Sequence, residues 1–442
     1  MAQRFEIHSH SHYSNIRLLD CINKPKNLID RAINIGLQGI CITDHETLSG
    51  HIECNIYAKE IKEKYPYFKI GLGNEIYLVN ERESGIKYPH MILLAKDKEG
   101  HRQLRELSSL AWMNSYRDRG LERVPTLKSD LAKIVSANPG HLIATSACIG
   151  GELSASVLEM EKARQLGDTT TAEKWKKNII DFVLWCKNLF GDDFYIECAP
   201  GASREQIIVN KKLAELAPQF GCKMVIGTDA HYLSLKEKYI HESFLNSKDG
   251  ERETDKFYKY SYLQTEEEII ENLTPSIVDS YEIMCNNSME IYDKIEFYDL
   301  THPQVIPSVE VKDYPKKEDF LGDFGKSVNP LLNEMFNSDN IYERYWVNEC
   351  FNKLEEIGKC NQEYLNRLEE EADIKKTIGE KLGTNMFSYP ITLQHYINMF
   401  WDCGSTVGAG RGSSCSGLNH YLLGVTQLDP IKWDLPFWRL EL

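Results

Sequence analysis

Short apolar runs alternate with longer segments of helical spacing along the first half of the chain. Residues 27–36, for example, carry apolar side chains at helical spacing and end at Gly36, a residue suited to a helix C-cap. The apolar runs have the length and composition of strands, and they cover residues 39–43, 69–73, 91–95, 141–145 and 194–197. This pattern predicts the order strand, crossover helix, strand, so we expect an α/β fold with a mainly parallel sheet or barrel.

The alternation of short apolar runs with helical segments ends near residue 300. Two prolines flank a short apolar pair at 303–307, and a charged connector follows at 315–319. Helical spacing then dominates, notably over 341–357 and 391–401. We therefore expect two domains, the second mainly helical, with the bounds 1–294 and 295–442.

Two stretches of the second part have a distinctive composition. Four carboxylates crowd residues 368–373, which is typical of a solvated helix face. Residues 407–417 form a glycine-rich run. Taken alone, such a run indicates either a flexible loop or a phosphate-binding segment.

Composition and charge narrow the class of protein. The chain has 442 residues, 42% hydrophobic and 26% charged, which is ordinary for a globular protein, and its apolar stretches are too short for a membrane span. With no export signal visible, we expect a cytoplasmic protein without membrane contact. The twelve cysteines include no Cys-x-x-Cys pair, so we expect reduced core thiols. The formal charge of −15 argues against a wholly basic nucleic-acid surface but leaves room for a local basic groove.

Two ligand-like pairs stand at the ends of predicted strands. They are His8-Ser9-His10 and Asp229-Ala230-His231. Residues two apart on a strand share a face, so each pair aims both side chains the same way. Imidazole and carboxylate donors without a thiolate pair suit zinc, manganese or iron in a hydrolytic centre.

Further polar residues near strand ends enlarge this set. Any one histidine taken alone is more often a surface or core residue than a ligand. A lone cysteine is as often a buried inert thiol as a ligand. However, five of the thirteen histidines fall in this one set. We predict nine candidate metal ligands, namely His8, His10, Asp20, His45, Glu75, His90, Cys148, Asp229 and His231. Nine donors suffice for two or three ions, and the two oxygens of Glu75 could bridge a pair of them.

The motifs around these residues resemble the PHP domain (polymerase and histidinol phosphatase domain) in the version found in the alpha subunit of bacterial DNA polymerase III. Cys148 falls where this branch carries a cysteine ligand, and Asp20 matches its aspartate after the first motif. The four motifs that carry the resemblance are His8-Ser9-His10, Ile42-Thr43-Asp44-His45, Gly73-Asn74-Glu75 with His90, and Thr228-Asp229-Ala230-His231.

The resemblance implies a distorted (βα)7-like barrel over residues 1–294 and an active site, since the ligand set is complete. The family's activity is phosphodiester hydrolysis, including 3′→5′ exonuclease proofreading, with two or three divalent ions of zinc, manganese or iron. The implied substrate is the 3′ end of DNA, single-stranded or in a primer-template. The residues we expect to be catalytic are His8, His10, Glu75, Asp229 and His231.

The glycine-rich run is similar to the start of the palm of C-family DNA polymerases, an impression strengthened by residues 426–430 and 433–437. In that family the segment contacts the triphosphate of the incoming nucleotide, which implies this role for Arg411, Gly412 and Ser413. Glycines let backbone N–H groups approach phosphate, and arginine is a bidentate donor. The palm aspartates of the family follow the segment matched by residues 437–439, so we expect that this chain alone does not polymerise DNA.

Two other functions stay open at this point. The chain could be one part of a longer or split DNA-directed DNA polymerase that acts in replication with the remaining polymerase segment and replisome proteins. It could also be a non-catalytic scaffold or binding module. The complete ligand set favours the hydrolase over the scaffold.

Overall fold

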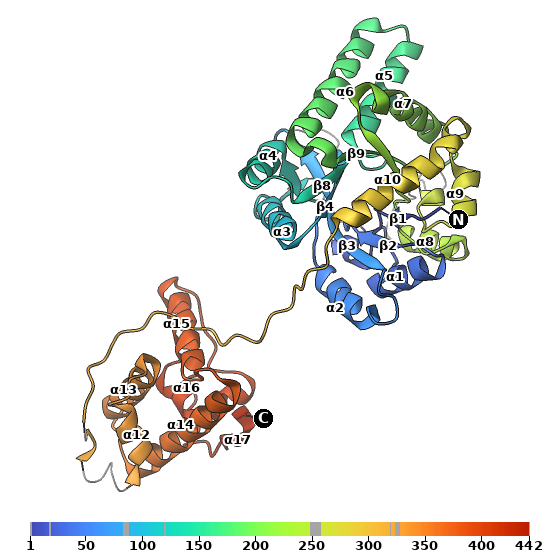
Figure 1. Ribbon diagram of the computed structural model, residues 1–442. Coiled ribbons are helices and arrows are strands. Elements are labelled where there is room, and N and C mark those ends of the chain that lie inside the picture. Colours follow the sequence, from blue (N-terminus) through green and yellow to red (C-terminus); the bar gives the residue numbers. More distant parts are fainter. Residues whose placement is uncertain are drawn as a thin grey trace. The chain divides into compact units, whose positions relative to one another are not determined.

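The computed structural model describes residues 2–16, 19–82, 88–118, 121–247, 258–318, 320–322 and 328–441. The chain forms two compact units, Met1–His302 and Pro303–Leu442 (Figure 1). None of the described helices combines the length and the apolar character that crossing a membrane requires. All twelve cysteines belong to the described part and are unpaired, and nine of them are buried, in agreement with the predicted reduced thiols.

One barrel-like sheet organises the first unit and confirms the predicted α/β fold. Its apolar strands are buried on both faces, as in parallel sheets covered by helices; Ile40, Cys41 and Ile42 have no exposed surface. In spatial order the strands are β1 (Phe5–Glu6), β2 (Gly39–Ile42), β3 (Lys69–Val79), β4 (His90–Ala95), β8 (Leu142–Thr145), β9 (Phe194–Cys198) and β10 (Lys223–Ile226), with β7 (Pro125–Leu127) beside β3. All neighbours run parallel except β4, which is antiparallel to β3 and β8.

The exception at β4 corrects the predicted strand–helix–strand order. No helix is described between β3 and β4, which pair directly with His90 opposite Tyr77. Strand β3 is also longer than the predicted 69–73, because its apolar run continues beyond Glu75 to Val79. The reversal has a functional consequence, since the beginning of β4 lies at the edge of the sheet where the parallel strands end.

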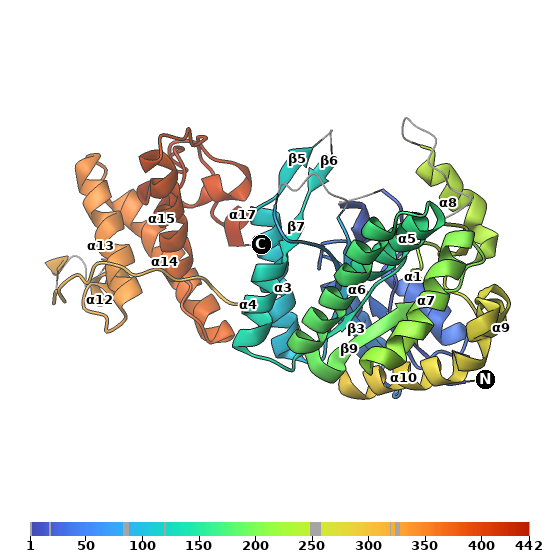
Figure 2. The ribbon, with the colours of Figure 1, turned by 90° about the horizontal axis from the view of Figure 1, so that it is seen from above.

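Helices surround this sheet (Figures 1 and 2). Helices α1 and α2 contact β2 and β3, α6 and α7 contact β9, and α10 packs against β1 and β10. A separate two-stranded antiparallel sheet is formed by β5 (Tyr116–Asp118) and β6 (Leu121–Arg123). The helices are α1 (Pro25–Asn34), α2 (His51–Ile61), α3 (Lys98–Met113), α4 (Lys128–Ala137), α5 (Glu152–Gln165), α6 (Thr169–Phe190), α7 (Arg204–Phe220), α8 (Lys238–Leu245), α9 (Glu266–Asn272) and α10 (Tyr281–Lys294).

The first unit continues past α10. The side chain of Asn55 on α2 donates to the carbonyl of Tyr298 at 2.7 Å and accepts from the backbone N–H of Leu300 at 3.0 Å. The boundary between the two compact units follows His302. The bounds 1–294 and 295–442 stay predictions as limits of two functional domains.

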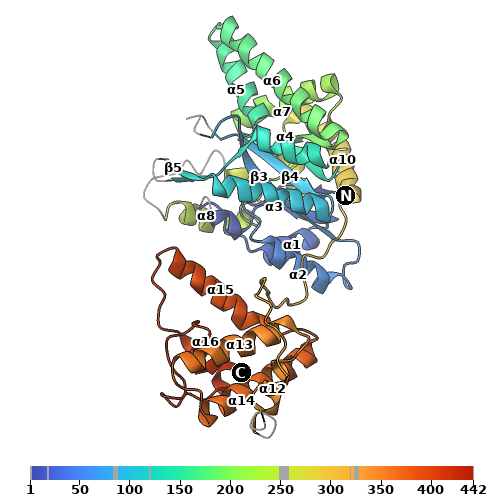
Figure 3. The ribbon, with the colours of Figure 1, turned by 90° about the vertical axis from the view of Figure 1, so that its left-hand side faces the viewer.

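The second unit is helical, as predicted (Figure 3). Its core gathers Trp346, Leu354, Leu368, Ile391 and Leu418. The helices are α12 (Pro330–Met335), α13 (Ile341–Glu356), α14 (Gln362–Leu382), α15 (Ser388–Asp402), α16 (Leu418–Leu422) and α17 (Trp438–Glu441).

The acidic run 368–373 is not wholly a solvated face, and that prediction was wrong in one respect. Glu370 is exposed, but Glu371 is fully buried on the side of α14 that faces α16. The carboxylate of Glu371 accepts from the backbone N–H groups of Leu418 at 2.6 Å and Asn419 at 2.8 Å. Glu371 thus satisfies the free N–H groups at the start of α16, which the local charge pattern does not reveal.

Candidate metal centre

The nine predicted ligands converge at one edge of the barrel-like sheet. Most follow the carboxyl ends of parallel strands, where such folds place their chemistry. Glu75 instead lies within β3, and His90 begins the antiparallel strand β4, which brings it to the same edge. Eight of the nine are buried, whereas the side chain of His90 is 22% exposed.

The His-x-His pair forms the centre of the cluster. The Nε2 atoms of His8 and His10 lie 3.0 Å apart. Oδ1 of Asp229 lies 3.2 Å from each of these nitrogens. Both pairs of the sequence motif therefore meet around one point.

Glu75 links the centre to the remaining histidines. Its Oε1 lies 2.8 Å from Nδ1 of His90 and 3.5 Å from Nε2 of His8. Its Oε2 lies 3.6 Å from Nε2 of His10 and contacts Nδ1 of His45. Since the two oxygens face different donors, Glu75 has the geometry of a bridging carboxylate.

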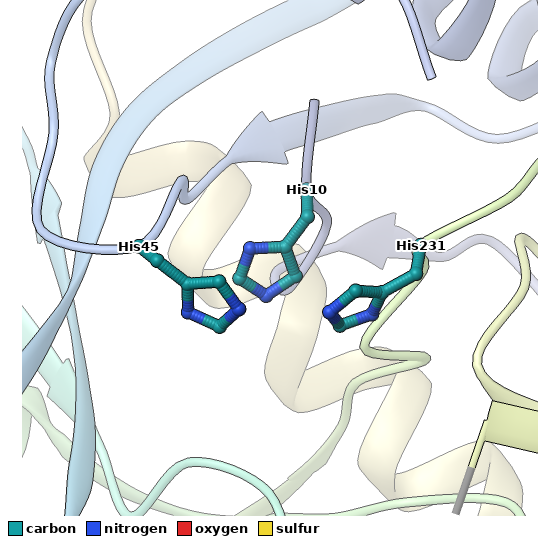
Figure 4. A group of neighbouring side chains, drawn as sticks. All are labelled: His10, His45 and His231. Carbon is teal, nitrogen blue, oxygen red and sulfur yellow. The ribbon is translucent and has the colours of Figure 1, made fainter. Parts of the chain in front are cut away.

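A third part of the cluster surrounds Asp20. Its Oδ2 lies 3.3 Å from Nε2 of His45 and 3.6 Å from Nε2 of His231. The rings of His10, His45 and His231 lie side by side (Figure 4), with the centroid of His10 4.2 Å from that of His45 and 4.5 Å from that of His231. Nδ1 of His231 is 2.8 Å from the carbonyl oxygen of Asp229, so its Nε2 is left to face the cluster.

Cys148 completes the set next to His90. Its Sγ lies 3.7 Å from Nδ1 of His90 and accepts from the backbone N–H of Gly150 at 3.4 Å. Burial and the nearby carboxylates of Asp229 and Glu75 raise the pKa of this thiol, so a cation is needed to favour the thiolate.

Three overlapping groups of donor atoms have the spacing of a metal site. In each group the ligand atoms lie within 4.8 Å of one another. The groups are His10 with His45 and His231, His8 with His10 and Glu75, and Glu75 with His90 and Cys148. His10 and Glu75 each belong to two groups, which suits neighbouring ions.

Unsatisfied polar atoms show that these residues fit divalent cations. Buried atoms normally have hydrogen-bond partners, and leaving one without a partner costs about 1–3 kcal/mol. The buried atoms without a hydrogen bond here are Oδ1 of Asp20, Nδ1 and Nε2 of His45, Oε2 of Glu75 and Oδ1 of Asp229. A cation among them would satisfy these lone pairs.

The electrostatics agree with this assignment. Burial alone would raise the pKa values of Asp20, Glu75 and Asp229, yet the surrounding histidines hold all three below their ordinary values. Three ionised carboxylates in a buried site require compensating positive charge. The cluster is therefore built for cations.

Three residues near the ligands adopt the left-handed backbone region, which is uncommon outside glycine. They are Glu46, Ala147 and Asp229, with φ of 51°, 57° and 47°. The first two stand next to His45 and Cys148. Such conformations cluster at functional sites, because a sharp turn after the strand re-aims the ligand.

Two buried carboxylates at the cluster were not among the predicted ligands. Glu197 is the last residue but one of β9 and lies 2.6 Å from Nδ1 of His8. Asp44, in the second motif, accepts from the backbone N–H of Ser11 at 2.6 Å and from the hydroxyl of Ser14 at 2.8 Å. The signal that could have found Glu197 is the one that found the others, a carboxylate at the carboxyl end of an apolar strand.

The residues predicted to bind triphosphate belong to the second unit. Arg411, Gly412 and Ser413 are exposed, and the last two begin a short 3-10 helix, Gly412–Ser416. The N–H groups that follow at Leu418 and Asn419 are occupied by Glu371. Nucleotide binding by the three exposed residues stays a prediction.

Comparison with known protein families matches both parts of the chain. Residues 6–200 match the PHP domain, and residues 338–440 match the bacterial DNA polymerase III alpha NTPase domain. The first match contains seven of the nine candidate ligands, from His8 to Cys148, together with Glu197.

Curated relatives match nearly the whole chain. It is 39% identical, over 98% of its length, to "Probable DNA polymerase YorL" of Bacillus subtilis and, with the same figures, to the DNA-directed DNA polymerase of Bacillus phage SPbeta. It is 26% identical, again over 98% of its length, to DNA polymerase III subunit alpha of Borreliella burgdorferi. The chain spans only 35% of the first two relatives and 33% of the third.

Proposed function

Because the chain consists of a PHP domain followed by a segment of the bacterial DNA polymerase III alpha family, we propose that its metal cluster hydrolyses phosphodiester bonds at the 3′ ends of DNA. The observation that carries this proposal is the overlap of three donor groups through His10 and Glu75. Neighbouring ions that share ligands suit phosphate chemistry, in which both the attacking and the leaving oxygen need stabilisation.

Each of the nine candidate ligands would have a place in the metal cluster. His8, His10, Glu75, Asp229 and His231 would hold the ions at the centre. The remaining ligands, Asp20, His45, His90 and Cys148, would complete two or three sites. Divalent zinc, manganese or iron bound there would supply positive charge opposite a phosphate and would acidify water.

His90 marks the side from which a substrate would approach. It is the one ligand of the nine whose side chain is substantially exposed, at 22%, whereas that of Asp229 is 7% exposed and those of His8, His10 and Glu75 are fully buried. A phosphate at the end of a DNA strand would therefore reach the Glu75, His90 and Cys148 group first. The buried part of the cluster would keep the ions in place.

A second function is favoured by the polymerase segment. The match over residues 338–440 and the names of the relatives support a role in a larger DNA-directed DNA polymerase that acts in replication. In that role Arg411, Gly412 and Ser413 would hold nucleotide triphosphate, and the partners would be DNA, the remaining polymerase segment and replisome proteins in the cytoplasm. The convergent donors speak against a purely scaffolding PHP domain.

An assay of strand degradation tests the hydrolase proposal. Purified protein is incubated with 3′-end-labelled single-stranded DNA, or with a primer-template, in the presence of manganese or zinc. We expect mononucleotides from the wild type and at least a 100-fold lower rate from Asp229→Asn, by analogy with the loss of one transition-state donor.

A matched control is Asp192→Asn, because Asp192 is exposed and lies outside the cluster. It should release mononucleotides at the wild-type rate. If the wild type releases none with either metal, or if Asp229→Asn is as active as the wild type, the hydrolase proposal is wrong.

A further inference from the structure

Glu197 is a fully enclosed carboxylate whose two oxygens are each committed to one donor. Its Oε1 lies 2.6 Å from Nδ1 of His8, and its Oε2 accepts from the hydroxyl of Thr145 at 2.5 Å. Its backbone N–H donates to the hydroxyl of Ser146 at 2.9 Å. The carboxylate is therefore held from both sides and from its own backbone.

The neighbouring strand leaves room for this contact. A Cβ atom at Gly227, just after β10, would lie 2.5 Å from Oε1 of Glu197 and 3.0 Å from Cβ of His8. A side chain at residue 227 would therefore require Glu197 or His8 to shift, and glycine lets them meet as they do. The ends of β9 and β10 thus both make room for the contact between Glu197 and His8.

This hydrogen bond determines which nitrogen of His8 is available. An ionised carboxylate only accepts, so Nδ1 of His8 carries the proton. The lone pair of Nε2 is then free to face the cluster, where Oδ1 of Asp229 is 3.2 Å away and Oε1 of Glu75 is 3.5 Å away. Rotation of the ring would break the contact with Glu197.

Asp44 holds the ring of His10 in a similar way, through the hydroxyl of Ser14. Its Nδ1 lies 3.2 Å from the hydroxyl oxygen of Ser14, and that hydroxyl donates to Oδ1 of Asp44 at 2.8 Å. Because the Ser14 proton is committed to Asp44, the serine oxygen can only accept from His10. Asp44 is itself fixed by the hydroxyl of Ser11 at 2.7 Å.

We propose that Glu197 and Asp44 are positioning residues of the metal centre, which hold His8 and His10 in the tautomer that turns both Nε2 lone pairs toward the ions. The inference rests on the metal-binding part of the proposed function and is independent of the nuclease step. A carboxylate behind a ligating histidine fixes the ring and strengthens its donor nitrogen, and loss of such a partner typically costs 10–100-fold in metal affinity.

Glu197→Gln tests the proposal with little change of shape. The glutamine carbonyl can still accept from His8 and its amide can donate to Thr145, so the fold is retained while the negative charge is lost. We expect manganese or zinc affinity, measured by competition with a chelator, to fall by about 10–100-fold. The melting temperature in excess chelator should match that of the wild type.

Glu371→Gln is the matched control, since Glu371 is an equally buried carboxylate in the second unit. It should leave the metal affinity unchanged. Affinity of Glu197→Gln within twofold of the wild type overturns the proposal. Absence of metal binding by the wild type overturns it as well, together with the proposed function, whereas a wild type that binds metal without cleaving DNA refutes the nuclease alone.

Asp44→Asn gives a second, spectroscopic test that does not depend on the Glu197 variant folding. An asparagine amide that donates to Ser14 would reverse its hydroxyl, which would then donate to Nδ1 of His10. Histidine ¹⁵N NMR of the zinc-loaded wild type should show Nδ1–H, Nε2-bound rings for both His8 and His10. Asp44→Asn should change the ring signals of His10 and leave those of His8 in place, and unchanged signals for both rings would contradict the proposal.

Discussion

The Nε2 atoms of His8 and His10 lie 3.0 Å apart, with Oδ1 of Asp229 3.2 Å from both. Two nitrogen lone pairs this close repel each other unless a proton or a cation lies between them. Burial and the charges of His45 and His231 lower the pKa of His10 to about 3. Although burial acts against it, the carboxylates of Glu197 and Asp229 raise the pKa of His8. The two shifts run in opposite directions, and a divalent ion between the two nitrogens would remove their repulsion.

Metal removal should destabilise the first unit. An ion at 100 times its Kd stabilises the folded state by about 2.7 kcal/mol, and the carboxylates of Asp20, Glu75 and Asp229 lose their compensating charge when it leaves. Thermal unfolding in excess chelator should give a lower Tm than in manganese or zinc, and added metal should restore it. Identical Tm values under both conditions would contradict a bound cation.

Gly227→Ala should disturb the metal centre without altering any ligand. The added methyl group meets Glu197 and His8 and forces them apart, at a cost of about 1–3 kcal/mol in unfolding free energy. Metal affinity measured by chelator competition should fall as well. Gly140→Ala is a comparison that meets no atom within 4 Å, although its φ of 91° makes some loss of stability expected there too. Metal affinity should stay unchanged in that variant alone.

Acid should weaken the first unit through His51. Burial and the neighbouring His101 lower the pKa of His51 to about 3, and its ring contacts the carbonyl of Gly73 at 2.9 Å. In the unfolded chain the group titrates near 6.5, so the unfolded state binds the extra proton below that pH. Stability is fully present above pH 6.5 and falls toward pH 3, by up to about 1.4 kcal/mol per pH unit.

Denaturant unfolding at several pH values between 7 and 4 checks this dependence. His51→Gln should lessen the slope of unfolding free energy against pH by about one proton, because the residue no longer titrates. His302→Gln, at an exposed position of the same unit, should keep the wild-type slope. A slope unaffected by His51→Gln would show that other groups carry the acid sensitivity.

Glu371→Ala should unfold the second unit more easily. Its removal leaves the N–H groups of Leu418 and Asn419 and the guanidinium of Arg367 without their carboxylate partner, at a cost of about 3 kcal/mol. Glu370→Ala, at the exposed neighbouring position, should change the unfolding free energy by less than about 0.5 kcal/mol. Equal effects from the two substitutions would show that the buried contacts contribute little.

The alternation of apolar runs predicted most strands of the barrel-like sheet and placed most of the candidate ligands near strand ends. The pattern did not predict the direction of every strand or the length of every strand. Periodicity marks 91–95 as a strand but does not say that β4 runs backwards beside β3, and only this reversal explains why His90 faces Glu75 from the beginning of a strand. Likewise, Glu75 lies within a strand rather than at its end, because β3 continues to Val79.

Partners distant in sequence are the part that pattern reading misses. Glu197 and His8 are separated by 189 residues, and the sequence around each residue gives no sign that the two are in contact. Glu371 looks like one of four solvated carboxylates until α16 packs against α14. In both cases the local pattern supplies the residue type, whereas its role is decided by tertiary contacts.

The left-handed backbone at Asp229, with φ of 47°, limits what this position can become. Among residues with a side chain, the short polar aspartate and asparagine are enriched in this region, and of these two only aspartate offers a carboxylate. A longer glutamate would keep the charge but would place its carboxylate one methylene group farther from the backbone. A relative that abandoned hydrolysis while keeping the barrel should therefore carry asparagine or glycine here, so this single position would record the loss of the chemistry while the fold around it survived.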